Sequence, residues 1–389
     1  MVNVSLISAI IFYALVILFF LKTKKRWDIQ GKIVALYKTK LGLKFMDALA
    51  GRYPRIMRVL GYIGVALGFI GMAFIFVTLI KSTIDLFFKS GVVGIAPVLP
   101  GIRIPGLPVL SFWHWLIGIF VLALVHEFAH GVLARTHGIK VKSSGFGFLG
   151  PIMLAFVEPD EKKMNKKSKM AQMSVMAAGP FSNMIFAAIF MVLFLLVAAP
   201  LTAATFDITG MQVNAFTEGL PAEISGLELP FVVTAINGIE VKNTTNFIKA
   251  TETIKPGTIT ILETDQGEFK IPTVESEENK TKGLIGMNNF ELKKEIKEGT
   301  SPFAAHSAEW ITLLLYWLFL LNLGVGLFNL LPLGPFDGGR MFFLAALAIF
   351  KNEKKAKKYW AIISYIIILL IIINLAPWLS KLVRFVSGF

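Results

Sequence analysis

Six apolar stretches, each about as long as a bilayer is thick, constrain this 389-residue chain more than any other feature. A membrane-spanning helix needs about 20 mainly apolar residues. Runs of that length occupy residues 4–21, 59–80, 111–134, 171–200, 307–350 and 359–377. Hydrophobic residues make up 55% of the chain and charged residues only 16%, which is typical of membrane proteins. We therefore expect a multi-pass α-helical membrane protein with about six transmembrane helices.

The uneven distribution of charge predicts how these helices are oriented. Segment 201–306 carries nine basic and fifteen acidic residues, a net charge of −6. Because the whole chain has a net charge of +14, the rest of the chain carries +20. The positive charges gather beside apolar runs, at 22–58, 135–169 and 351–358. Because cytoplasmic loops carry such an excess of Lys and Arg, these stretches are assigned to the cytoplasm. Both termini and segment 201–306 are then extracytoplasmic, and no nucleic acid is expected as a partner.

Segment 201–306 has the pattern of a small soluble module. Two short apolar runs, 231–236 and 239–241, are separated by Asn237-Gly238, a pair that predicts a β-hairpin turn. We therefore divide the chain into four parts. Residues 1–110 hold two N-terminal spans and their loops, 111–200 the first part of a membrane core, 201–306 the inserted α/β module, and 307–389 the second part of the core.

The third apolar run contains the motif His126-Glu127-Phe128-Ala129-His130. Residues i and i+4 share one face of a helix, so both imidazoles can reach one zinc ion, with the glutamate beside a zinc-bound water. Two histidines packed against polar neighbours are the ordinary alternative. At membrane depth, however, ionisable groups are costly and mark functional sites. The chain has no cysteine, so any metal must be held by nitrogen and oxygen.

A catalytic zinc takes three protein ligands and keeps one position for water, which calls for a third ligand. Asp337 is the candidate, because it is the only acid between Glu309 and Glu353. Proline and glycine on both sides of it break the helix, and such backbone at membrane depth is tolerated only where it is buried in protein or lines a water-filled cavity. Asp337 could instead cap the helix that starts near Gly338, or do both.

Together these motifs resemble the site-2 protease family of intramembrane zinc metalloproteases. The matching segments are H-E-F-A-H at 126–130, G-P-F-S-N at 179–183 and N-L-L-P-L-G-P-F-D-G-G at 329–339, with a Gly-rich segment at 145–151. In this order they lie within residues 111–377. The resemblance also implies that the Gly-rich segment forms a sheet-like, membrane-associated hairpin.

The resemblance implies a site residue by residue. One catalytic zinc ion is held by His126, His130 and Asp337, and Glu127 acts as general base. Asn183 holds the substrate peptide or its oxyanion, a role that an amide donor can fill. An interhelical hydrogen bond is the structural alternative for Asn183.

The implied activity is hydrolysis of peptide bonds in or near transmembrane segments. Single-span membrane proteins within the lipid bilayer are the expected substrates, and the active site lies in the membrane toward its cytoplasmic side. The outer module resembles a PDZ domain, with a Pro221-Ala222 helix start and a Gly226-Leu227 end before the hairpin. PDZ domains bind extended peptide ends. A β-rich module that only blocks access is the alternative.

Two other functions stay open. A membrane zinc protease that cuts soluble or lumenal peptides would more usually take its third ligand from a glutamate on a following helix. A non-proteolytic membrane metal-binding protein or transporter would more often place several acids along a path, and the other spans lack them.

Overall fold

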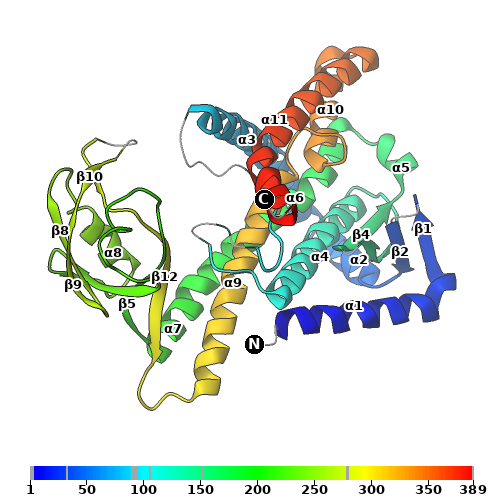
Figure 1. Cartoon of the computed structure of the whole chain (residues 1–389). Coiled ribbons are helices and arrows are strands. Elements are labelled where there is room, and N and C mark those ends of the chain that lie inside the picture. Colours follow the sequence, from blue (N-terminus) through cyan, green and yellow to red (C-terminus); the bar gives the residue numbers. More distant parts are fainter. Residues whose placement is uncertain are drawn as a thin grey trace. The chain divides into compact units, whose positions relative to one another are not determined.

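The structure, a computed structural model, describes residues 4–31, 34–88, 95, 97–102, 104, 107–150, 152–276 and 280–387 (Figure 1). The chain forms two compact units. The membrane unit comprises residues 1–102, 109–194 and 313–389, and the sheet unit comprises residues 103–108 and 195–312. Six helices in the described part are long and apolar enough to cross a bilayer, so the chain is a multi-pass helical membrane protein.

The long helices follow the predicted apolar runs. They are α1 (Val4–Thr23), α3 (Pro54–Phe88), α4 (Phe112–Thr136), α6 (Lys169–Leu193), α9 (Pro302–Phe328) and α11 (Glu353–Ser387). Shorter helices are α2 (Leu43–Arg52), α5 (Glu161–Asn165) and α10 (Asp337–Phe350). The predicted run 307–350 is interrupted as expected, because residues 329–336 separate α9 from α10. The end of α6 continues through a π-helical turn (Phe194–Ala198) into α7 (Ala199–Thr205).

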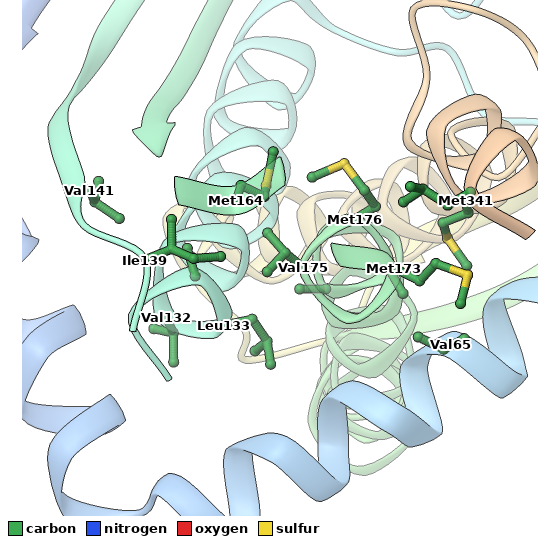
Figure 2. Packing of buried hydrophobic residues seen from close by; sticks show 14 of the residues in the cluster. Val65, Val132, Leu133, Ile139, Val141, Met164, Met173, Val175, Met176 and Met341 are labelled. Atoms are coloured by element: carbon green, nitrogen blue, oxygen red, sulfur yellow. The ribbon is translucent and has the colours of Figure 1, made fainter. Parts of the chain in front are cut away.

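The core of the membrane unit is built where α3, α4, α6 and α10 meet. Figure 2 shows Val65 of α3, Leu133 of α4, Val175 of α6 and Met341 of α10 in one cluster of buried side chains. Dispersion contacts of this kind hold membrane helices together, because lipid tails are as apolar as the side chains. The cluster fixes α4 against α6, the two helices that carry most of the predicted site.

Small residues let α3 approach this core closely. Four of its glycines lie along one buried face: Gly61, Gly64, Gly68 and Gly71. A Cβ at Gly61 would overlap the hydroxyl of Ser174 on α6, and one at Gly68 would press on Met341 of α10. Close helix packing through small residues is usual in membranes. The second predicted span therefore packs directly on the helices of the core.

A four-stranded antiparallel sheet accompanies the helices of the membrane unit. Its strands β1 (Trp27–Gln30), β2 (Val34–Thr39), β3 (Val141–Leu149) and β4 (Ile152–Pro159) are arranged in that order. The hairpin expected after the metal helix is present as β3 and β4, although Pro151 lies outside the described residues. Sequence reasoning missed that β1 and β2 extend it. A Cβ at Gly145 or Gly147 would collide with backbone of β2, so the glycines permit this pairing.

The sheet unit contains the predicted segment 201–306. Its main sheet has the order β12-β5-β6-β8-β9, with β7 paired to β6. The strands are β5 (Phe206–Phe216), β6 (Phe231–Ile236), β7 (Ile239–Glu240), β8 (Ile259–Thr264), β9 (Gly267–Pro272) and β12 (Met287–Ile296), with a separate pair β10 (Val274–Glu275) and β11 (Gly283–Leu284). The predicted hairpin is confirmed, because β6 pairs antiparallel with β7. The two residues between these strands, Asn237 and Gly238, have φ of 49° and 76°.

The helix expected to start at Pro221-Ala222 is wrong. Residues 221–226 form successive turns instead, and the helix of this unit is α8 (Thr244–Thr251). The amide of Ala222 donates to the carbonyl of Ile285, outside the segment. Gly226 ends the turns in the left-handed region, with φ of 88°. Within the stretch, the amides of Glu223 and Ser225 donate three residues back, to Leu220 and Ala222, which closes single turns instead of a helix.

Candidate metal centre

Helix α4 presents the two histidines of the motif on one face. It starts at Ser111, whose hydroxyl accepts a hydrogen bond from the amide of His114 as an N-cap. The rings of His126 and His130, one turn apart, have centroids 4.7 Å apart, and both residues are buried. The helical spacing thus points both imidazoles the same way, as predicted.

Asp337 closes the site from a distant part of the sequence. Its Oδ2 lies 3.0 Å from Nε2 of His126 and 3.3 Å from Nε2 of His130. It is the first residue of α10, and Phe336 occupies the N-cap position, so the carboxylate faces the imidazoles rather than capping the helix. Among the described residues these three form the one group of this kind, with ligand atoms within 4.8 Å of one another.

The broken segment before α10 sets the direction of Asp337. The amide of Gly338 donates to the carbonyl of Asn329 at 2.8 Å, which folds the start of α10 back onto the end of α9. A Cβ at Gly338 would overlap backbone of Leu330, and one at Gly339 would overlap backbone of Leu333. The two glycines after the aspartate are therefore required by packing.

The arrangement fits a zinc ion. Tetrahedral zinc with bonds of about 2.0–2.1 Å separates its ligands by roughly 3.3 Å, close to the 3.0 and 3.3 Å from Asp337 to the two imidazoles. Two nitrogens and one oxygen are also a common catalytic donor set. A Cβ at Gly179 of α6 would overlap Nε2 of both histidines, so the absence of a side chain there keeps space beside the ligand atoms.

The two histidines have different partners on their other ring nitrogen. Nδ1 of His130 lies 2.7 Å from the carbonyl oxygen of Val175. Nδ1 of His126 lies 3.2 Å from the amide nitrogen of Asn183, which is fully buried. The structure thus brings Asn183 to the site, on the side of His126 that faces away from Asp337.

Glu127 is held by backbone. Its Oε2 accepts a hydrogen bond of 2.9 Å from the amide of Val157 on β4. Sequence reasoning missed this contact and the carbonyl of Val175, because main-chain groups are present at every residue and leave no sequence signal. The space that Gly179 leaves beside both imidazoles was missed as well.

Known proteins of similar sequence include one family of peptidases. The model of peptidase family M50 matches residues 114–373, which include both histidines, Glu127, Asn183 and Asp337. The uncharacterized protein MJ0971 of Methanocaldococcus jannaschii is 30% identical over 340 residues, 86% of this chain and 83% of that protein. The protein named Putative zinc metalloprotease CPE1693 of Clostridium perfringens is 22% identical over 309 residues, 62% of this chain and 89% of that protein.

Proposed function

The chain belongs to peptidase family M50, and we propose that it cuts peptide bonds in or near the transmembrane segments of other membrane proteins. One observation carries the proposal. The ligand atoms of His126, His130 and Asp337 converge on helices that belong to a membrane-spanning chain. A hydrolytic site formed by membrane-spanning helices would act on peptide segments that are themselves in the bilayer.

The chemistry follows from these residues. His126, His130 and Asp337 would hold zinc, which when bound acidifies a water molecule and polarises a carbonyl. Glu127 is placed to take the proton of the attacking water and to pass it to the leaving amine. The hydrogen bond from Val157 fixes the direction of its carboxylate. Donation by Asn183 to the oxyanion stays a prediction, since its contact here is with His126.

The substrate must change shape before it is cut. A transmembrane helix keeps its carbonyls in i to i−4 hydrogen bonds, so the helix has to unwind locally to expose one. We expect single-span membrane proteins with helix-breaking residues near the cleavage site. Strand β4 pairs with β3 along one edge, and its other edge, where Val157 meets Glu127, offers main-chain groups to an unwound segment.

The topology belongs to the same proposal. The positive stretches 22–58, 135–169 and 351–358 are assigned to the cytoplasm, as the positive-inside rule requires. The sheet unit is then extracytoplasmic, and we assign it PDZ-like binding of extended peptide ends. Its antiparallel sheet with one short helix is compatible with that role.

The test is cleavage of a single-span substrate by the purified protein. We expect a zinc chelator to abolish cleavage, and Glu127→Gln to lower it by about 10²–10⁴-fold while zinc stoichiometry stays near that of the wild type. Asp337→Ala should lose zinc as well as activity. Cleavage that persists in Glu127→Gln would overturn the mechanism. Zinc bound without cleavage of any substrate would favour the alternative, a non-proteolytic metal-binding protein or transporter.

A further inference from the structure

The imidazole of His126 faces the site with one nitrogen and Asn183 with the other. Nε2 lies 3.0 Å from Oδ2 of Asp337, and Nδ1 lies 3.2 Å from the side-chain amide of Asn183. A neutral imidazole carries one N–H, on either Nδ1 or Nε2. A metal bound through Nε2 therefore requires the proton on Nδ1, where the amide of Asn183 lies.

His130 has a partner of the kind that such a ligand requires. The carbonyl of Val175, 2.7 Å from its Nδ1, can only accept, so Nδ1 carries a proton. A metal at the site would then bind His130 through Nε2.

Asn183 has the chemistry to give His126 the same kind of partner. It is fully buried, and its Oδ1 has no hydrogen-bond partner among the described residues. Rotation of the amide by a half turn exchanges nitrogen and oxygen with little change of shape. Oδ1 then accepts from Nδ1–H of His126, which leaves Nε2 for the metal.

The spacing of the second motif agrees with this assignment. Gly179 and Asn183 are four residues apart on α6, so they share one face. Gly179 gives room beside Nε2 of both histidines, and Asn183 meets the opposite nitrogen of His126. On α9, Gly326 faces Asn183, since a Cβ there would lie 3.1 Å from the Cβ of Asn183. The side chain of Asn183 therefore lies between the imidazole of His126 and the backbone of α9 at Gly326.

We propose that Asn183 is a positioning residue that holds His126 in the tautomer that binds zinc. Its amide oxygen, turned toward Nδ1, accepts the N–H of that nitrogen and leaves Nε2 for the metal. The inference rests on the proposed metal site but not on the reaction. It deepens that site by giving the Gly-Pro-x-x-Asn helix a role in metal affinity.

The test measures zinc affinity by competition with a chromophoric chelator. Asn183→Leu, of similar volume, should lower the affinity about 10–100-fold, the usual cost of losing the partner of a metal-bound histidine. Asn183→Asp, which offers Nδ1–H only acceptors, should restore it to the wild-type value or above. Ser182→Ala is the matched control, since the Ser182 hydroxyl contacts only the carbonyls of Gly179 and Val125 among the described residues, and should leave the affinity unchanged.

Two results would overturn the proposal. Wild-type zinc affinity in Asn183→Leu would exclude a positioning role, and a loss of cleavage alone would assign Asn183 to the oxyanion. An affinity that falls in Asn183→Leu and stays low in Asn183→Asp would exclude control of the tautomer. These measurements use no substrate, so a failure of the proposed protease activity would be seen separately.

A second measurement needs no variant at Asn183. The chain has five histidines, so ¹⁵N resonances of the imidazoles can be assigned by replacing one histidine at a time. In zinc-loaded protein we expect both His126 and His130 as the Nδ1–H form. A zinc-loaded protein in which Nδ1 of His126 carries no proton would contradict the proposal.

Discussion

The imidazoles of His126 and His130 meet beside a residue without a side chain, Gly179. A methyl group there would overlap Nε2 of both rings, and overpacking of this kind costs about 1–3 kcal/mol. We therefore expect Gly179→Ala to weaken zinc binding by roughly 5- to 150-fold, measured as zinc retained against a chelator. Gly324→Ala on α9 is the control, because a Cβ there meets nothing within 4 Å. Equal zinc retention in both variants would contradict the inference that the zinc site needs the space left by Gly179.

His137, just after α4, links pH to stability. Burial lowers its pKa, and the positive charges of Arg58 and Lys167 lower it further. In the unfolded chain the pKa of this imidazole is about 6.5. Between that pH and the lower pKa of the folded state, the unfolded chain binds a proton at His137 and the folded chain does not. Stability is therefore lost as pH falls from about 6.5 toward the folded pKa.

The measurement is the melting temperature in detergent from pH 8 to 5. We expect His137→Gln to lose less stability than the wild type over the acid part of this range, because it has no proton to bind at that position. His306→Gln removes an exposed histidine and should follow the wild type. Parallel curves for wild type and His137→Gln would show that His137 does not contribute.

Side chains of the site could be predicted where their chemistry is rare in the surrounding sequence. His126, Glu127, His130 and Asp337 are ionisable residues in apolar runs. The structure brings the two histidines and Asp337 together, and Glu127 follows His126 on α4. The partner of Asn183 could not be predicted. Whether an amide on one helix faces an imidazole or a substrate depends on how α6 is rotated against α4, and that rotation is fixed by packing.

At the scale of elements, strand β4 holds Glu127, the proposed base on α4. The amide of Val157 donates to Glu127 and so points away from β3. Proline is tolerated at an edge strand where its missing N–H is not part of the ladder. We therefore expect Val157→Pro to fold and to hold zinc, but to cut its substrate roughly 100-fold more slowly, the order of effect of a base misplaced by about 1 Å.

Val157→Ala is the matched control, because it keeps the backbone donor and removes only the side chain. Both variants are assayed for zinc content and for cleavage of a single-span substrate. Similar rates in the proline and alanine variants would show that the hydrogen bond to Glu127 does not orient the base.

Elements were predictable to the extent that their pattern is local. The hydrophobic spans and the Asn237-Gly238 hairpin depend on neighbouring residues and were correct. The pairing of β2 with β3 joins residues more than a hundred positions apart, and no local pattern reports it. The segment 221–226 was predicted wrongly, because its amides donate three residues back, Glu223 to Leu220 and Ser225 to Ala222, and so form turns.

At the scale of the whole molecule, the two compact units predict that the part of the sheet unit that holds its strands, residues 206–296, can be removed. Its strands begin at Phe206 and end at Ile296, and the amide of Lys297 donates to the carbonyl of Thr205 at 3.0 Å. The ends of the excised segment are therefore adjacent, so two glycines can replace residues 206–296 without pulling on the flanking helices. The ligands of the metal centre all lie in the membrane unit.

We expect this deletion variant to bind zinc with wild-type stoichiometry and to cut a single-span substrate that has no extracytoplasmic domain. Substrates that differ only in their extracytoplasmic part should be cut at different rates by the full chain and at similar rates by the variant, because a peptide-binding or blocking module acts on that part. The same deletion with Glu127→Gln should be inactive, which shows that residual cleavage uses the same site. Loss of zinc from the deletion variant would mean that the metal centre depends on the sheet unit for its fold.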